Sequence, residues 1–504
     1  MGNTMDGLQD PKFMRSSPPS QWIRFLIQSH TLWTSPLVIL LFASLIRFAV
    51  SVYPYSGFNK PLMFGDYEAQ RHWMEITIHL SPQQWYWYDL EWWGLDYPPL
   101  TAYHSWLCGK IGHLIEPSWF ALDTSRGYES PASKFFMRST VYFSELFLYV
   151  PAVYAFCQLV YGSQGFFKKH VAAILILLQP ALLMIDHGHF QFNSVMLAFS
   201  LWSFVCFLSK HYVLGAIAFC LSLGFKQMAL YYSPAVFAYL LGRCFVEERG
   251  FLLFIKLGVT VVATFSALVY PWIGSLEQLG QLVHRIFPVA RGLYEDKVAN
   301  VWCALNIVVK LRHHMSTEAT VKLSLVATLC AVIPIAIQLG LNPSRRRFIY
   351  ALVNSSLAFF LLSFQVHEKS ILLPLLPVSL LFIEEPVASN VMLNTAMFSM
   401  YPLLHREKLV LPYFITTILW NWLSGIQNME GVLARCLIWG PQALFVTWYA
   451  CHSFIPPPQP LPDLYAVLNA ILSCGIFTML LFYFVYRQFT LSSVSLSAKK
   501  EKNQ

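Results

Sequence analysis

Long apolar runs alternate with short polar segments along most of the chain. A helix needs about 20 residues to cross the hydrocarbon core of a bilayer, and fewer where flanking side chains reach the interface. We predict fourteen membrane-spanning helices, near residues 36–53, 137–160, 171–186, 193–209, 212–226, 228–242, 251–272, 319–339, 348–364, 370–385, 389–404, 409–425, 432–450 and 464–486. Two longer polar stretches, 54–136 and 273–318, remain outside these spans.

Basic residues in the short connections predict how the chain is oriented, because Lys and Arg are retained on the cytosolic side of a membrane. The clusters are Lys168-Lys169, Lys210, Arg243 with Arg249, Arg345 to Arg347, and the tail Lys499 to Lys502. With fourteen spans, all of these basic clusters fall on the cytosolic side. This requires that residues 298–309, which are too short to cross, stay on the far side.

This alternation predicts the division of the chain. We expect a cytosolic segment at 1–35, a transmembrane domain at 36–486 with far-side loops 54–136 and 273–318, and a cytosolic tail at 487–504. An even number of spans places both ends of the chain on the same side.

The composition agrees with an all-α polytopic membrane protein. Hydrophobic residues make up 56% of the 504 residues and charged residues only 12%. The chain therefore has too few polar residues to cover the surface of a soluble protein. The net charge of +8 does not indicate nucleic-acid binding, because the basic residues form short clusters rather than one continuous face. Ten scattered cysteines show neither a disulfide framework nor zinc-ligand spacing.

Polar residues of unusual type are expected to gather on the far side. The turns 187–191, 226–227 and 365–369 face that side together with the two long loops. The aromatic run at 85–93 is typical of a membrane interface and also suits stacking on sugars, and the pattern leaves both roles open. The far face is therefore where we expect the chemistry of this protein.

Asp66 and Glu68 are the first candidates for that chemistry. Two carboxylates separated by one residue can share a hard divalent cation, or they can be an ordinary solvated pair. Asp66 also precedes Arg71 and shares its loop with Asp96. A carboxylate beside apolar and aromatic groups is a suitable general base, because desolvation raises its pKa toward the working range.

A second candidate segment is His367-Glu368-Lys369, which lies between two long apolar runs. Three consecutive ionisable residues at such a place form either an ordinary polar turn or a cationic clamp on a phosphate, with His367 and Lys369 as the donors.

Two further patterns stay open. His187 and His189 favour structural hydrogen bonds over a zinc pair, because no third ligand accompanies them. The charged run 291–297, which begins with Arg291 and Gly292, is either a flap over a site or an ordinary loop.

Five motifs occur in order along the chain, at residues 65–73, 94–100, 188–191, 295–300 and 365–370. Together they resemble the endoplasmic-reticulum glucosyltransferases that use dolichyl-phosphate glucose, a family of the multispanning GT-C class. Two paralogous activities share this architecture. Residues 68–73 are similar to the enzyme that adds the first glucose to the lipid-linked oligosaccharide, and the enzyme that adds the second glucose is the alternative.

The resemblance implies a metal-independent, inverting transfer in the endoplasmic-reticulum membrane, with the active site on the lumenal side and no cofactor. Glucose leaves dolichyl-phosphate glucose and forms an α-1,3 bond to the dolichyl-pyrophosphate-linked oligomannose acceptor, Man9GlcNAc2. Asp66 matches the acidic residue that acts as general base in the family. The residues expected to bind substrate are Glu68, Arg71, Asp96, His367, Lys369 and Arg291.

Two other classes fit the sequence less well. A secondary transporter would place ionisable residues near the middle of broken spans, whereas here they lie at span ends and in one long loop. A metal-dependent oligosaccharyltransferase subunit would carry a sizeable soluble C-terminal domain, whereas only a short tail follows residue 486.

Overall fold

The computed structural model describes residues 12–164, 166–287 and 297–491, and within these ranges the chain is helical and contains no strand. Arg291 and the basic tail Lys499 to Lys502 lie outside the described residues. The prediction of an all-α protein is confirmed.

Helices occupy every segment that was predicted to span the membrane. They are α3 (Ser35–Ser51), α6 (Pro131–Tyr161), α7 (Phe166–Leu177), α9 (Asn193–Leu208), α10 (Tyr212–Phe225), α11 (Ser233–Val246), α12 (Gly250–Leu268), α16 (Thr317–Leu341), α17 (Arg345–Leu362), α18 (Leu372–Leu380), α19 (Pro386–Arg406), α20 (Val410–Ser424), α21 (Val432–Phe454) and α22 (Leu464–Thr490). Among the described residues, seven helical stretches are long and apolar enough to cross a membrane. The chain is therefore a multi-pass membrane protein, and the number fourteen stays a prediction.

The structure interrupts the predicted span 171–186. Helix α7 ends at Leu177, and a new helix begins with α8 (Pro180–Leu182) and continues as the π-helical segment η7 (Leu183–Phe190). Pro180 cannot continue a helix, because it lacks the N–H group, but it suits a first helical position. The Gln179 side chain caps the new helix by accepting a hydrogen bond from Leu182 N at 2.6 Å.

The predicted span 370–385 is also shorter than expected. It consists of the 3-10 helix η10 (Glu368–Ile371) and the nine-residue α18. Pro377 lies inside α18 and removes the N–H that would reach the carbonyl of Leu373. The hydroxyl of Tyr232 replaces that donor and hydrogen-bonds Leu373 O at 2.5 Å.

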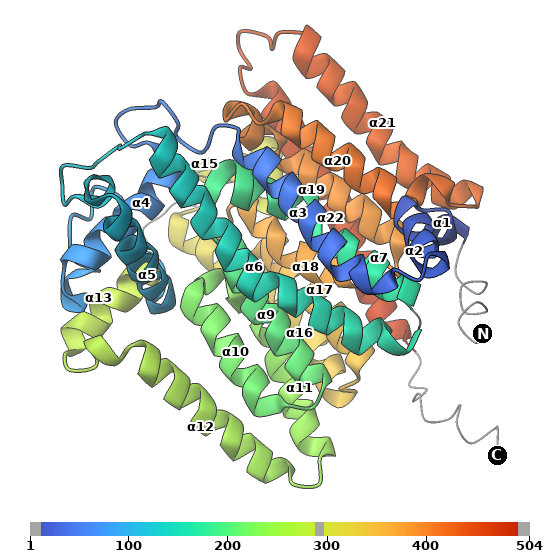
Figure 1. The fold of residues 1–504 in the computed structure, drawn as a ribbon, viewed down its shortest axis with the longest axis horizontal. Helices are drawn as coiled ribbons and strands as arrows, with labels where there is room; N and C mark the ends of the chain where they lie inside the picture. The colour runs from blue at the N-terminus through green and yellow to red at the C-terminus, as the bar shows by residue number, and fades with distance from the viewer. Residues whose placement is uncertain (1–11, 165, 288–296, 492–504) are drawn as a thin grey trace.

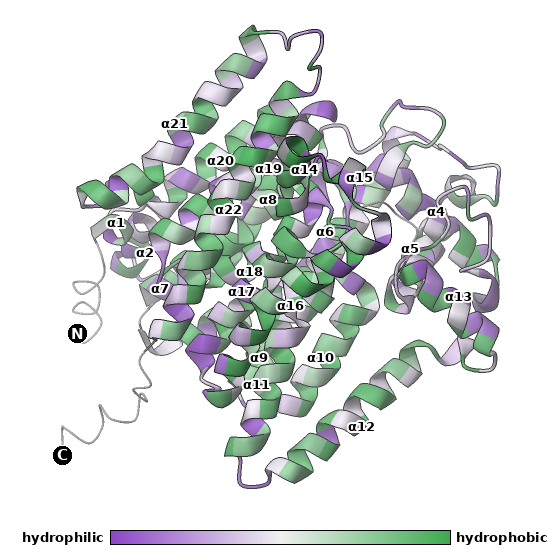
Figure 2. Cartoon of the chain, turned by 180° about the vertical axis from the view of Figure 1, so that it is seen from behind, coloured by the Kyte–Doolittle hydropathy of each residue, from purple (hydrophilic) through white to green (hydrophobic). Residues whose placement is uncertain are grey.

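Several helices outside the predicted spans lie at the two ends of the bundle. Helices α4 (Gly65–His79), α5 (Pro99–Ile115) and α13 (Leu276–Ile286) gather at one end, whereas α1 (Lys12–Arg15) and α2 (Pro18–Gln28) lie at the opposite end (Figure 1). Hydrophobic residues dominate the bundle helices, and hydrophilic residues are more frequent in α4 and α13 (Figure 2). The short helices α14 (Val301–Val309) and α15 (Leu311–His314) follow α13 in the chain.

Short 3-10 helices join many of these elements. They are η3 (Leu32–Thr34), η4 (Pro82–Gln84), η5 (Pro117–Phe120), η6 (Gly162–Gln164), η8 (Gln227–Tyr232), η9 (Tyr270–Trp272) and η11 (Ile426–Asn428).

The two long polar stretches pack on each other. Arg285 of α13 donates hydrogen bonds to the carbonyl oxygens of Gly94 at 2.7 Å and Leu95 at 3.1 Å. Trp272, just before α13, donates to Pro82 O at 2.9 Å. Loop 54–136 and the start of 273–318, as far as α13, therefore lie on the same side of the bundle, as the alternation of spans requires.

Candidate active site

Asp66 lies in the first turn of α4, and its side chain is held by three others. Gln191 Nε2 donates to Asp66 Oδ2 at 2.6 Å, and His189 Nε2 lies 3.0 Å from the same oxygen. Lys369 Nζ forms an ion pair with it. The Asp66 side chain is still 25% exposed, so a substrate can reach it.

A strained turn places Asp66 at this point. Phe64 and Gly65 adopt φ angles of 56° and 66°, in the left-handed region. A Cβ atom on Gly65 would lie 2.7 Å from Ser56 Oγ and 2.8 Å from Gly57 N, so only glycine fits there. The Ser56 hydroxyl in turn accepts a hydrogen bond from Asp66 N at 3.3 Å.

The partners of Asp66 come from distant parts of the chain. His189 belongs to η7, Gln191 is the first residue after η7, and Lys369 lies in η10. The structure thus brings together the polar turns 187–191 and 365–369 with the start of α4. Sequence reasoning expected them on one face but did not foresee that His189 would contact Asp66.

Glu407 extends the cluster and was absent from the predicted site. Its two carboxylate oxygens lie 2.7 and 2.8 Å from His189 Nδ1, and its side chain is 6% exposed. Glu407 follows α19 in a polar run, residues 405–408, between two predicted spans. Fourteen alternating spans would put this run on the far side too, so a signal was present in the sequence, but the run was not included among the predicted far-side segments.

Lys226 lies behind Gln191. Its Nζ donates hydrogen bonds to Gln191 Oε1 and Asn193 Oδ1, both at 2.8 Å, and lies 4.8 Å from the ring centre of Tyr97. Asp96 precedes Tyr97, is half-buried, and is close enough for its charge to act on Lys226. Asp96, which was predicted to bind substrate, is therefore near this cluster.

Asp66 is ionised in this arrangement. Burial by itself raises its pKa, but the charge of Lys369 and the hydrogen bond and charge of His189 outweigh burial and hold the pKa well below 3.8. For Lys369 burial has the opposite effect and lowers the pKa, but the charge of Asp66 outweighs it, so the pKa of Lys369 is above its ordinary value. The two groups thus form a charged pair across the neutral pH range.

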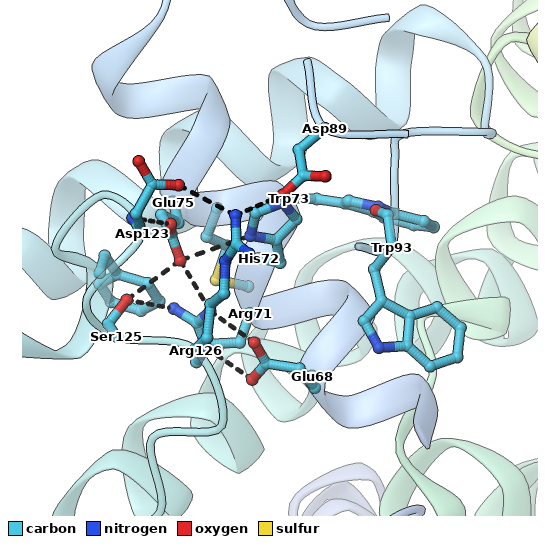
Figure 3. Close-up of polar contacts among 12 residues, drawn as sticks. Glu68, Arg71, His72, Trp73, Glu75, Asp89, Trp93, Asp123, Ser125 and Arg126 are labelled. Atoms are coloured by element: carbon cyan, nitrogen blue, oxygen red, sulfur yellow. Dashed lines mark hydrogen bonds and ion pairs between the residues drawn. The ribbon is translucent and has the colours of Figure 1, made fainter. Parts of the chain in front are cut away.

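Glu68 and Arg71 lie in a different cluster, which we call the Arg71 cluster (Figure 3). Arg71 Nη2 lies 2.6 Å from Glu68 Oε1 and 2.7 Å from Glu75 Oε2, and Arg71 Nη1 donates to Ser125 Oγ at 2.6 Å. Arg71 and Glu75 are fully buried, and the side chain of Glu68 is 2% exposed. The carboxylates of Asp66 and Glu68 are thus bound to different cations.

The Arg71 cluster fixes the loop between α5 and α6 against α4. Glu75 Oε1 accepts a hydrogen bond from Asp123 N at 2.8 Å, and Ser125 Oγ donates to Glu75 Oε2 at 3.0 Å. Burial raises the pKa of Glu75, but His72, whose Nδ1 lies 3.4 Å from Glu75 Oε2, and the charge of Arg71 lower it to about 2. Glu75 is therefore a permanent anion that compensates the buried guanidinium.

The remaining predicted residues have the following positions. His367 is exposed and precedes η10, two residues before Lys369. His187 Nε2 lies 2.6 Å from Glu145 Oε2, and Glu145 is bound to Arg47 at 2.5 Å inside the bundle. Within the three described ranges, no group of three or more His, Cys, Asp or Glu residues could hold a metal ion.

Fold and site together define a polytopic membrane protein with a carboxylate, a lysine and a histidine in contact at one end of a helical bundle. The model of the ALG6, ALG8 glycosyltransferase family matches residues 40–483. The chain belongs to this family, as its motifs suggested.

Curated relatives cover nearly the whole chain. A protein of Schizosaccharomyces pombe, called a probable dolichyl pyrophosphate Man9GlcNAc2 alpha-1,3-glucosyltransferase, is 44% identical over 93% of this chain and 95% of its own length. Proteins of Gallus gallus and Saccharomyces cerevisiae with the name dolichyl pyrophosphate Man9GlcNAc2 alpha-1,3-glucosyltransferase are 43% and 40% identical. They cover 90% and 92% of this chain and 96% and 93% of their own lengths.

Proposed function

We propose that this protein transfers the first glucose from dolichyl-phosphate glucose to dolichyl-pyrophosphate-linked Man9GlcNAc2 and forms an α-1,3 bond with inversion. The names of the relatives support the acceptor and the bond. The observation that carries the proposal is Asp66, a partly exposed carboxylate whose contacts include a lysine and a histidine.

An inverting transfer needs one base on the acceptor hydroxyl and stabilisation of the leaving group. We assign the first role to Asp66. The acceptor oxygen attacks C1 of glucose, its proton passes to Asp66, and the bond from C1 to the phosphate oxygen breaks with its electron pair on the phosphate. Lys369 and His367 are then the hydrogen-bond donors to the dolichyl phosphate that leaves, so the step does not require a metal ion.

Lys369 has two possible anionic partners in this scheme. Without donor it neutralises Asp66. A donor phosphate competes for the same ammonium group, and a lysine that moves toward the phosphate leaves Asp66 more basic. Donor binding would thus activate the base at the same time as it places the leaving group.

The other predicted substrate-binding residues have three different roles. We propose that Glu68 and Arg71 hold α4 in place, since their polar atoms are already bound inside the Arg71 cluster. Asp96 orients Lys226 and Tyr97 beside the acceptor. Arg291, which lies outside the described residues, remains a proposed substrate-binding residue.

We further propose that α4, α5 and α13 lie in the lumen of the endoplasmic reticulum and that both chain ends are cytosolic. The basic start of α17 supports this, since basic residues favour the cytosolic side and Arg347 hydrogen-bonds the carbonyl of Leu491, which follows α22.

A glycosylation acceptor fused to the C-terminus should stay unmodified in microsomes, and one inserted at residues 58–62 should be modified. A modified C-terminal tag would mean that the number of spans is odd.

Reconstitution tests the reaction itself. Purified protein in detergent is incubated with dolichyl-phosphate glucose or dolichyl-phosphate mannose and with Man9GlcNAc2 or singly glucosylated acceptor. We expect transfer only from the glucose donor to Man9GlcNAc2, with and without EDTA. Transfer only to the glucosylated acceptor would identify the second glucosyltransferase instead, and activity that EDTA abolishes and manganese restores would contradict the metal-free step.

The Lys369→Gln and His367→Ala variants test the assigned phosphate contacts. Each loses a charge-assisted hydrogen bond to the leaving phosphate, which costs roughly 2 to 4 kcal/mol of the barrier and slows turnover roughly 30- to 1,000-fold. Lys60→Gln is the control, because Lys60 is an exposed cation on the same side, and its ammonium group donates to Arg406 O at 3.4 Å rather than to the Asp66 site. Wild-type turnover of His367→Ala would remove His367 from the site.

A further inference from the structure

His189 is almost fully buried, and both of its ring nitrogens face ionisable groups. Nδ1 lies 2.7 and 2.8 Å from the two oxygens of Glu407, and Nε2 lies 3.0 Å from Asp66 Oδ2 and 3.2 Å from Lys369 Nζ. The three partners come from the end of α19, from the start of α4 and from η10. The imidazole therefore bridges Asp66 and Glu407.

The chemistry of these partners fixes the tautomer of His189. A carboxylate can only accept hydrogen bonds, so the nitrogen that faces Glu407 must carry a proton. Nε2 then has two states. As a free lone pair it accepts from Lys369 Nζ, and as N–H it donates to Asp66 Oδ2. The same geometry thus accommodates both the neutral imidazole and the imidazolium.

We propose that His189 receives the proton that Asp66 takes from the acceptor hydroxyl, and that Glu407 is the positioning residue for this relay. The inference rests on the proposed function. The acceptor O–H bond breaks, the proton binds the Asp66 carboxylate and then His189 Nε2, and the leaving electron pair stays on the donor phosphate. Glu407 holds Nδ1–H and stabilises the positive charge on the ring.

The relay resolves a difficulty of the Asp66 site. A carboxylate whose pKa lies far below the working pH binds a proton only weakly. An adjacent imidazole in contact with an anion is the stronger proton acceptor, because the carboxylate stabilises its charged form. The proton therefore moves away from the reacting oxygen, and Asp66 returns to its ionised state.

A second buried Glu–His pair in the same structure shows what distinguishes His189. Glu145 contacts His187 Nε2 at 2.6 Å, but the other ring nitrogen of His187 has no hydrogen-bond partner among the described residues. That pair has no route to Asp66. Burial of a histidine against a glutamate is thus not sufficient for the relay. The relay also needs the contact between His189 Nε2 and Asp66.

All charged neighbours of His189 enter the expected pH dependence. They are Asp66, Lys369 and Glu407, and Arg138 of α6 binds the carbonyl of the adjacent Gly188 at 2.7 Å. Because Asp66 is ionised in the enzyme without donor, the acid side of the kcat/KM profile, which reports the free enzyme, follows the loss of a proton from His189. Removing the Glu407 charge destabilises the imidazolium, so this acid limb must move to lower pH.

The experiment is a pH–rate profile of the Glu407→Gln variant in the reconstituted reaction. We expect the maximal kcat to fall about 10- to 100-fold, the acid limb to move down by about one to two pH units, and KM for the donor to stay unchanged. Glu407→Asp should recover part of the rate and the wild-type limb. His189→Gln keeps a hydrogen-bond donor toward Asp66 but cannot accept the proton, so it should lose the limb altogether.

Controls separate the relay from a structural role. Glu145→Gln removes a buried carboxylate charge from the other Glu–His pair, and Glu318→Gln removes an exposed carboxylate charge. Per folded molecule, both should keep the wild-type profile. A lower rate of Glu407→Gln with an unshifted acid limb would overturn the relay. A wild-type acid limb in the His189→Gln variant would overturn it as well. If Glu407→Gln does not fold, the His189→Gln profile decides the question alone. Absence of transfer by the wild-type protein would instead reject the proposed function.

Discussion

Replacing Asp66 by Asn is expected to slow glucosyl transfer by a factor on the order of 100 to 10,000, the usual contribution of a general base. Asn keeps the shape of the side chain and can still hydrogen-bond within the cluster, but it cannot take the proton of the acceptor hydroxyl. Binding of the donor should be retained. Single-turnover rates together with a donor-binding assay separate the two effects.

The matched control for this variant is Asp89→Asn. Asp89 lies in the same loop region and is also paired with a cation, Arg126, but it does not contact the Asp66 cluster in any described interaction. Its turnover should equal that of the wild-type protein. If Asp66→Asn keeps nearly full activity while Glu68→Gln abolishes it, the base is Glu68 and the assignment made here is wrong.

The Arg71→Met variant is expected to lose about 3 to 5 kcal/mol of stability. Removing the guanidinium leaves Glu68 and Glu75 buried without their cation, and an uncompensated buried charge costs far more than the pair contributes. The measurement is thermal unfolding in detergent. Because no substrate contact is assigned to Arg71, the kcat of the fraction that remains folded should change little.

Arg126→Met is the matched control for the Arg71 cluster. Arg126 also pairs with two carboxylates, those of Asp89 and Asp123, but its side chain is 34% exposed (Figure 3). Exposed pairs contribute at most about 1 kcal/mol. A triple variant, Glu68→Gln with Arg71→Met and Glu75→Gln, should recover part of the lost stability. Equal destabilisation by Arg71→Met and Arg126→Met would show that burial does not control the effect.

Apolar periodicity was sufficient to locate the membrane helices but not their interruptions. Run length and hydropathy identify a segment such as 171–186, because the bilayer selects for both. The break before Pro180 has a local signal, the proline and the capping bond of Gln179 three residues before Leu182. Inside α18, the donor that Pro377 lacks is replaced by Tyr232, which is distant in the sequence and leaves no local pattern.

The candidate site was predictable where an ionisable residue interrupts apolar sequence. Lys369 was found in this way, since a charge at a span end is costly unless it has a partner or a function. Asp66 was found instead from its spacing with Glu68 in the long polar loop and from the motif at 65–73. Glu407 was overlooked, although the ionisable run 405–408 interrupts apolar sequence in the same way. The pairing of Glu68 with Arg71 was visible in principle, since residues three apart share one face of a helix.

The separation of the site residues along the chain also bears on how the protein is made. Lys369 follows Asp66 by 303 residues, which corresponds to roughly 15 to 60 s of synthesis at about 5 to 20 residues per second. During that time Asp66 has no lysine to neutralise it. The Arg71 cluster needs no residue beyond Ser125, so it can form soon after α6 is inserted. A nascent chain can therefore hold α4 in its final conformation while the partners of Asp66 are still being translated.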